Sequence, residues 1–190
     1  MAGRIERGFV IVSGAPGAGK STLAFPLAAR LGLPLIAKDV IKETLHDHIP
    51  ARGEAREWSR HLGAAAMELI WALTAVTPAA VLEANFRPKS AYEQARFAAL
   101  PGPLVEVYCS IPPALAAARY AARHAGRHPT HVVGELTPEQ LAEFDRPIGL
   151  GQLVQVDTTE AVDVGAVAAS VLAAFRDDGR GRPPARRPRS

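Results

Sequence analysis

The chain has 190 residues, of which 48% are hydrophobic, and this is enough to bury one substantial core. Its formal net charge of +3 arises from five arginines in the final segment, Gly179–Ser190, because the rest of the chain carries 17 basic and 19 acidic residues. A nearly neutral body argues against a broad nucleic-acid surface.

The last residues differ in composition from the body. Since there is no internal repeat and no long linker, we expect one α/β domain over residues 1–176 and a tail over residues 177–190. The Gly, Pro and Arg content of the tail predicts disorder. The tail either binds RNA, DNA or another acidic partner, or it is a solubilising end. The sequence leaves the oligomeric state open.

The single cysteine and the N-terminal residues bear on location. Cys109 has no partner for an internal disulfide, which fits a reducing compartment, and its place at the end of an apolar run favours buried packing over catalysis. The apolar run Phe9–Val12 is too short for a signal peptide or a membrane span. We therefore expect a cytoplasmic protein without membrane contact.

The first predicted strand leads into a phosphate-binding loop. Phe9–Val12 reads as a buried strand, and a helix is predicted to open at Ser21. Between them, GAPGAGKS fits the pattern G-x-x-x-x-G-K-[ST], in which backbone N–H groups and a helix N-terminus surround phosphate oxygens. The residues expected to hold the nucleotide are Gly14, Ala15, Pro16, Gly17, Ala18, Gly19, Lys20, Ser21 and Thr22.

Two side chains of this loop carry specific roles. Lys20 is expected to bring a positive charge to the β- and γ-phosphates, and the Ser21 hydroxyl to help hold Mg²⁺. A nucleotide and a magnesium ion are therefore expected together.

The elements after the loop alternate between helix and strand. Nearly continuous apolar strands separated by helices imply a parallel sheet covered on both faces, so the fold class is α/β. Ligands in such sheets bind beyond the carboxyl ends of the strands. Strands are predicted at Leu33–Ala37, Ala79–Glu83, Leu104–Cys109 and Leu153–Val156, and helices at Val40–His48, Glu54–Val76, Ser90–Leu100, Pro113–His124 and Ala161–Phe175.

A carboxylate follows the second predicted strand. Transfer of a γ-phosphoryl group to an alcohol needs a carboxylate that accepts or orients the hydroxyl proton, and Asp39 is our candidate. The alternative is that Asp39 caps the helix Val40–His48. Lys42, one helical turn later, either pairs with Asp39, contacts an anionic substrate or faces solvent.

With these segments the chain resembles small P-loop kinases of the group that includes polynucleotide kinase 5′-phosphoryl domains, chloramphenicol phosphotransferase and zeta toxins. The resemblance implies a P-loop NTPase with an adenylate-kinase-like sheet of five parallel strands flanked by helices, a small arginine-bearing lid, and ATP as the phosphoryl donor. The segments that carry it are Gly14–Ser21, Lys38–Lys42, Val81–Phe86 and Val156–Thr159.

The resemblance also assigns residues to the nucleotide. Asp157 would border adenine, Arg123 and Arg127 would close over the phosphates as catalytic groups, and Arg119 would lie nearer the base. Spacing of four places the three arginines on one helix face if the helix continues to Arg127, and a solvated charged face is the alternative.

Three histidines, His124, His128 and His131, accompany these arginines. Histidine spacing alone is compatible with zinc, but no cysteine or carboxylate joins the group in the sequence, so lid contacts or exposure are favoured.

The residues at the end of the third predicted strand have several possible roles. Glu83 stands where the group more often has aspartate, and it either holds the metal shell, acts as the base in place of Asp39, or satisfies a buried strand end. Asn85 and Arg87 are candidates for acceptor recognition, although the segment also reads as an ordinary turn.

Together these features predict an ATP- and Mg²⁺-dependent phosphotransferase that acts on a hydroxyl of a small molecule such as an antibiotic, sugar, nucleoside or nucleotide. A polynucleotide 5′-hydroxyl kinase is the alternative within enzymes, and an ATP-binding regulatory or toxin-like interaction module is the alternative outside them. Nucleic acid is an open but less favoured partner.

Overall fold

The computed structural model describes residues 5–181, with side chains through Asp177. Each predicted strand and helix is present, with shifts at the ends. The strands are β1 (Gly8–Ser13), β2 (Leu35–Ala37), β3 (Ala79–Glu83), β4 (Leu104–Ser110) and β5 (Gln152–Asp157). The helices are α1 (Lys20–Leu31), α2 (Lys38–His48), α3 (Ala55–Val76), α4 (Ala91–Ala98), α5 (Pro113–Ala122), α6 (Pro138–Leu141) and α7 (Val164–Gly181), with short 3₁₀ turns η1 (His124–Gly126) and η2 (Ala142–Phe144).

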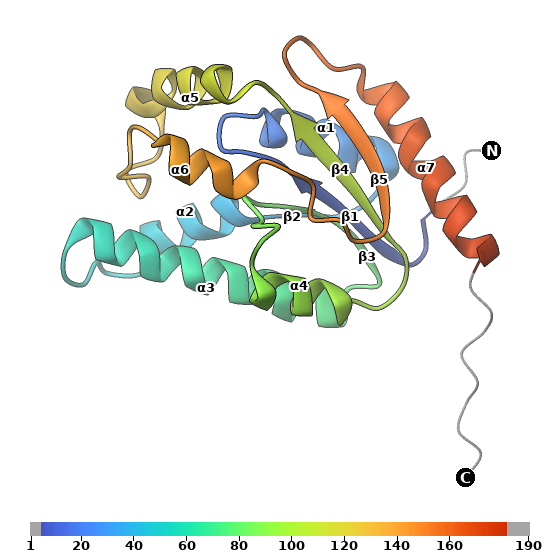
Figure 1. Ribbon diagram of the computed structural model, residues 1–190. Helices are drawn as coiled ribbons and strands as arrows, with labels where there is room; N and C mark the ends of the chain where they lie inside the picture. Colours follow the sequence, from blue (N-terminus) through green and yellow to red (C-terminus); the bar gives the residue numbers. More distant parts are fainter. Residues whose placement is uncertain (1–4, 182–190) are drawn as a thin grey trace.

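The five strands form one parallel sheet in the order β2-β3-β1-β4-β5 (Figure 1). This confirms the predicted α/β class and the parallel arrangement. Because all strands run the same way, the loop after β1, the start of α2, and the ends of β3, β4 and β5 meet at one edge of the sheet.

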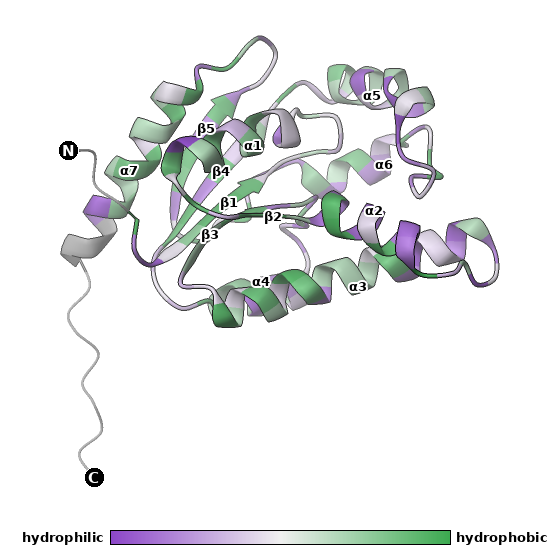
Figure 2. Cartoon of the chain, turned by 180° about the vertical axis from the view of Figure 1, so that it is seen from behind, coloured by the Kyte–Doolittle hydropathy of each residue, from purple (hydrophilic) through white to green (hydrophobic). Residues whose placement is uncertain are grey.

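Alternation along the strands sends side chains to two apolar cores. On one face, Val10 and Val12 of β1 pack with residues of α1 and α7, such as Leu27 and Val171. On the other face, Phe9 and Ile11 join a core with residues of α3 and α4. The central strands are hydrophobic along most of their length (Figure 2). A sheet covered on both sides follows from this pattern.

Several element ends differ from the prediction. Helix α2 begins at Lys38, so Lys38 and Asp39 lie in its first turn rather than before it. Helix α5 ends at Ala122, and the chain leaves it through η1. The short α6 and η2 were not predicted, because four helical residues carry little periodic signal; Thr137 starts α6 with a capping box to Gln140.

The predicted tail begins inside a helix. Residues 177–181 continue α7, and the predicted disorder over residues 182–190 lies outside the described residues. Within the described part of the chain, none of the helices combines the length and apolar character needed to cross a bilayer.

Candidate active site

The phosphate loop adopts a backbone that only glycine accepts readily. Gly14, Gly17 and Gly19 have φ values of 130°, 90° and 77°. A Cβ atom built on Gly17 would lie 2.1 Å from the carbonyl oxygen of Ala116 on α5, so the loop packs directly against that helix. The loop ends at the N-terminus of α1, where unpaired N–H groups favour an anion.

Lys20 and Glu83 form a buried pair of charges beside this loop. Lys20 is 5% exposed, its Nζ donates to the Ala15 carbonyl at 2.8 Å, and burial lowers its pKa, with the nearby Glu83 acting in the opposite sense. Burial likewise raises the pKa of Glu83, against the effect of Lys20. A phosphate at the loop would favour the charged form of Lys20, whereas a cation such as Mg²⁺ would favour the charged form of Glu83.

Ser21 and Glu83 offer the oxygen atoms that a magnesium ion prefers. The Ser21 hydroxyl donates to Glu83 Oε1 at 3.4 Å, a long hydrogen bond between two groups on the α1 and β3 ends. A hydroxyl and a carboxylate facing each other at the phosphate loop fit a Mg²⁺ that keeps most of its other ligands from phosphate and water. The residues present therefore fit the ion.

A cavity of about 640 Å³ lies on the β5 side of the loop. Arg119 and Arg123 line it together with Gly17, Gly19 and Thr22. Arg119 donates to the backbone carbonyls of Thr158 and Thr159 at 2.7 and 2.6 Å, which holds the loop after β5 against α5. These dimensions suit the nucleoside part of a nucleotide whose phosphates enter the loop.

Asp157 does not line this cavity. Its Oδ1 accepts a hydrogen bond from the Thr159 N–H at 2.8 Å, which lowers the pKa of the Asp157 carboxyl and shapes the turn after β5. The neighbouring residues Thr158 and Thr159 form the wall instead. Asp157, which was predicted to border adenine, therefore forms a turn contact in the structure.

A second, smaller cleft of about 100 Å³ lies on the other side of the loop. It brings together ten of the residues singled out in the sequence. Those lining it are Pro16, Gly17, Gly19, Lys20, Ser21, Asp39, Glu83, Asn85, Arg123 and Arg127.

Asp39 faces this cleft from the first turn of α2. The N-cap of α2 is Ala37, with no side-chain capping bond, so Asp39 is not the helix cap. Its side chain is 41% exposed, and Oδ2 lies 3.6 Å from Nη2 of Arg127. A partly exposed carboxylate that lines the cleft together with Lys20 can accept a hydrogen bond from a hydroxyl group.

The shared helix face of the three arginines was predicted only if the helix continued to Arg127, and α5 ends at Ala122, so that condition is not met. Arg123 is the C-cap residue and lines both cavities, so it lies where nucleotide and acceptor would meet. Arg127 follows η1, stacks over the Tyr120 ring at 4.9 Å and reaches Asp39. We call residues 123–135, which connect α5 toward α6, the lid segment.

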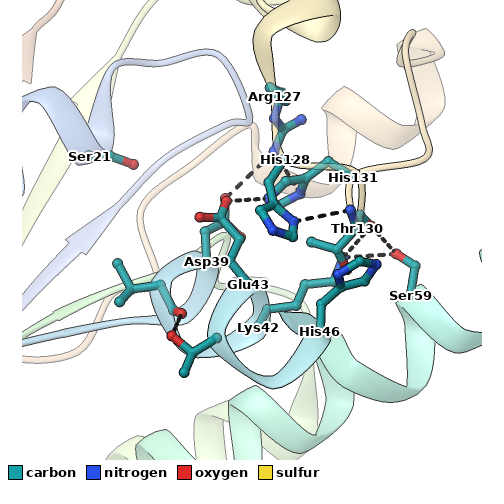
Figure 3. A network of polar contacts seen from close by, with 12 residues as sticks. Ser21, Asp39, Lys42, Glu43, His46, Ser59, Arg127, His128, Thr130 and His131 are labelled. Atoms are coloured by element: carbon teal, nitrogen blue, oxygen red, sulfur yellow. Dashed lines mark hydrogen bonds and ion pairs between the residues drawn. The ribbon is translucent and has the colours of Figure 1, made fainter. Parts of the chain in front are cut away.

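Two predicted acceptor-binding residues have other partners. Lys42 is buried, and its Nζ donates to Ser59 Oγ at 2.8 Å and to the Thr130 carbonyl at 3.2 Å (Figure 3). Its ammonium thus joins α2, α3 and the lid segment rather than lining the cleft. Arg87 forms an exposed ion pair with Glu143 at 3.0 Å. Asn85, the other residue predicted to recognise the acceptor besides Asp39, does line the cleft.

Two cleft residues, Glu43 and Tyr120, were missed by sequence reasoning, and His131, for which lid contacts or exposure were predicted, also lines the cleft. A signal existed for the first, because Asp39, Glu43 and Asp47 repeat at intervals of four and so share one face of α2. Each of them pairs with a basic residue of the lid segment. Asp39 pairs with Arg127 and Glu43 with His131 (Figure 3), and Asp47 pairs with His128.

One cluster has metal-ligand composition but is satisfied by hydrogen bonds. Donor atoms of His46, Asp47 and His128 lie within 4.8 Å of one another. However, His128 Nδ1 accepts from the Thr130 N–H, so its Nε2 carries the proton and donates to Asp47 at 2.9 Å. A metal ligand instead needs a bare nitrogen at that position. His124 is exposed and lies near Gly134.

Cys109 is 1% exposed, and burial raises the pKa of its thiol to about 11. A protonated thiol in the core beside β1 is a packing group rather than a nucleophile, as its sequence position suggested.

Comparisons with known proteins agree with this geometry. A family model described as "AAA domain" matches residues 9–147. A candidate kinase from Chloroflexus aurantiacus j-10-fl is 30% identical, with a TM-score of 0.74 over 90% of this chain and 99% of that one. No curated protein matches the chain.

Two solved structures with lower identity share the fold. A gluconokinase from Sinorhizobium meliloti 1021 is 20% identical, with a TM-score of 0.55 over 92% of this chain and 94% of that one. A shikimate kinase from Acinetobacter baumannii, solved with shikimate, is 14% identical, with a TM-score of 0.57 over 90% of this chain and 94% of that one.

Proposed function

Since the chain belongs to the AAA-domain family and has the fold of the small P-loop kinases, we propose that it transfers the γ-phosphoryl group of ATP to a hydroxyl of a small molecule. The observation that carries the proposal is the cleft that Lys20, Ser21 and Asp39 line together. A phosphate donor held by the loop and an alcohol held at Asp39 would meet in this cleft.

The proposed reaction is a direct displacement. The acceptor oxygen forms a bond to the γ-phosphorus while the bond from that phosphorus to the bridging oxygen of ADP breaks, and the hydroxyl proton passes to the Asp39 carboxylate. Lys20, Arg123 and Arg127 would offset the charge on the transferred group. Ser21 and Glu83 would hold a Mg²⁺, and that ion would offset negative charge on the phosphates.

The size of the cleft favours a small acceptor. About 100 Å³ between charged side chains leaves little room beyond one compact polar molecule, whereas a polynucleotide 5′ end needs an open basic groove. Asp39, Glu43 and Asn85 all present oxygen atoms that accept hydrogen bonds from hydroxyl groups. A hydroxylated molecule of the kind named for the neighbouring gluconokinase and shikimate kinase fits this lining.

The proposal includes the cellular compartment of the enzyme. ATP, Mg²⁺ and a lone reduced thiol at Cys109 suit the cytoplasm, where we place the enzyme.

The proposal is tested by measuring ADP release with a coupled assay over a panel of hydroxyl acceptors that includes gluconate, shikimate, hexoses, nucleosides and a 5′-hydroxyl oligonucleotide. We expect one small acceptor to stimulate release. Lys20→Ala and Asp39→Asn should each lower that rate at least about a hundredfold. Nucleotide binding should survive in Asp39→Asn, because the carboxylate acts on the acceptor.

Asp47→Asn is the matched control, since Asp47 lies on the same face of α2 two turns from Asp39 and outside the cleft. Full transfer by Asp39→Asn would move the base to Glu83. Stimulation by the oligonucleotide alone would support a polynucleotide kinase, and tight ATP binding with no acceptor would support a regulatory module.

A further inference from the structure

The Arg127 guanidinium is held on several sides. Tyr120 lies against its face at 4.9 Å, while Nη2 faces Asp39 Oδ2 at 3.6 Å and His131 Nδ1 at 3.0 Å. Among the described residues, Nη1 is buried and has no hydrogen-bond partner. A guanidinium that is held at Nη2 and has two unpaired N–H bonds on Nη1 is suited to bind an anion.

The contacts of His131 determine where its proton lies. An arginine can only donate hydrogen bonds, so His131 Nδ1 must accept from Arg127. The single proton of the neutral ring is then on Nε2, which donates to Glu43 Oε1 at 2.8 Å (Figure 3). Glu43 therefore selects the tautomer that leaves Nδ1 free for Arg127.

We propose that the Glu43–His131 pair is a positioning device that aims Arg127 at the γ-phosphate of the bound nucleotide. The inference rests on the proposed kinase function. His131 acts through Arg127 and needs no contact with the reacting atoms. Its side chain is 7% exposed and lines the same cleft as Lys20 and Ser21, so the device lies beside the phosphate loop.

Protonation of His131 would disable the device. A second proton on Nδ1 would place an N–H bond against the N–H bonds of Arg127. Burial lowers the pKa of His131; the surrounding charges are Glu43 and Asp39, which raise it, and Arg127 and Lys42, which lower it. The neutral ring therefore persists into more acidic solution than for an ordinary histidine, whose pKa is about 6.5.

The test compares the affinities of the Mg²⁺ complexes of ADP and of the non-hydrolysable β,γ-imido analogue of ATP, measured by calorimetry on the full chain. The ratio of the two reports the contribution of the γ-phosphate and requires no acceptor. His131→Ala should lower this preference about tenfold with little change for ADP, the loss expected for one charge-assisted hydrogen bond.

Two amide variants separate the two nitrogens of His131. The oxygen of Asn at position 131 occupies the place of Nδ1 and can accept from Arg127, whereas the amide nitrogen of Gln occupies the place of Nε2 and reaches Glu43 only. His131→Asn should keep the preference to within about twofold, and His131→Gln should lose it like His131→Ala. His124→Gln, in the exposed part of the lid segment, is the matched control and should not alter it.

A pH series adds an independent readout. In the natural chain the preference for the γ-phosphate should fall as the pH drops through the titration of His131, and His131→Asn should lack that fall. The two proteins share the protonation of the nucleotide itself, so their difference isolates the histidine. Equal behaviour of the Asn and Ala variants, or a preference that no variant changes, would overturn the device while leaving nucleotide binding in place. Failure of the natural chain to bind either nucleotide would instead overturn the proposed kinase.

Discussion

At the scale of single residues, the site depends on a few backbone positions more than on side chains. Gly14, Gly17 and Gly19 have positive φ values, a conformation that lets a phosphate loop turn its N–H groups inward. Gly17 also lacks the Cβ atom that would strike α5. These glycines let the phosphate loop and α5 approach each other, and the cavities on both sides of the loop include α5 residues as a result.

The role of Gly17 is testable with a paired substitution. Gly17→Ala places a methyl group 2.1 Å from the Ala116 carbonyl, so α5 or the loop must shift, and we expect affinity for Mg²⁺–ATP to fall at least about tenfold. Gly32→Ala is the control, because Gly32 also has a positive φ, of 66°, but no heavy atom within 4 Å. It should cost about 1 kcal/mol of stability from backbone strain and leave the affinity unchanged. Calorimetry and urea unfolding measure both; equal affinity losses would contradict the packing argument.

At the scale of elements, the lid segment packs on α2 through ion pairs and hydrogen bonds. Asp39, Glu43 and Asp47 present a row of carboxylates on one side of the helix, each paired with a lid residue. Lys42 supplies a buried connection, since its ammonium meets Ser59 of α3 and the Thr130 carbonyl together. The position of Arg127 over the cleft is thus set by α2 and α3 as well as by its own segment.

Replacement of Lys42 should loosen this connection. In Lys42→Met the two acceptors lose a buried donor, and Ser59 still donates to the Thr130 carbonyl at 2.7 Å. We expect a loss of about 1–3 kcal/mol in unfolding free energy and faster hydrogen exchange over residues 127–131. Lys89→Met, which removes an exposed ion pair with Asp145, should cost less than about 1 kcal/mol. Unchanged exchange in Lys42→Met would mean that the ion pairs along α2 suffice.

At the scale of the whole molecule, the parallel sheet places two cavities on either side of one loop. The larger is lined by residues of α1, α5 and the loop after β5, and the smaller by residues of α2, the end of β3 and the lid segment, with Arg123 in the lining of both. In the proposed reaction, nucleotide and acceptor would therefore reach the γ-phosphate position from opposite sides, as an in-line transfer requires.

Binding across this edge should stabilise the entire fold. Mg²⁺–ATP at one hundred times its dissociation constant should add about 2.7 kcal/mol to the unfolding free energy, since the loop binds the nucleotide only when folded. Removal of magnesium with EDTA should lower the shift in melting temperature, and Lys20→Ala should nearly abolish it. Differential scanning fluorimetry measures each case; a shift that is the same with and without magnesium would contradict the ion site at Ser21 and Glu83.

The sequence was most informative where local chemistry suffices. Spacing and composition identified the loop pattern at Gly14–Ser21 and the alternation of apolar strands with helices. They also identified Asp39 as the carboxylate after the second strand. The element ends were less accurate, since Lys38 and Asp39 belong to the first turn of α2 and α5 stops at Ala122. Propensities change little over one turn, so neighbouring packing decides such ends.

What the sequence by itself determined is the phosphate loop and the parallel sheet, because a turn motif and a hydrophobic period act over a few residues and need no distant partner. Only the tertiary structure decided that Lys42 is a buried connection, that Arg127 lies beyond α5 and meets Asp39, and that Glu43 and His131 belong to the cleft. These roles depend on contacts between residues far apart in the sequence, as with Lys42 and Thr130 or Glu43 and His131, each pair separated by 88 positions. Local periodicity carries no record of that separation, since it is the packing of the lid segment on α2 that brings the two together.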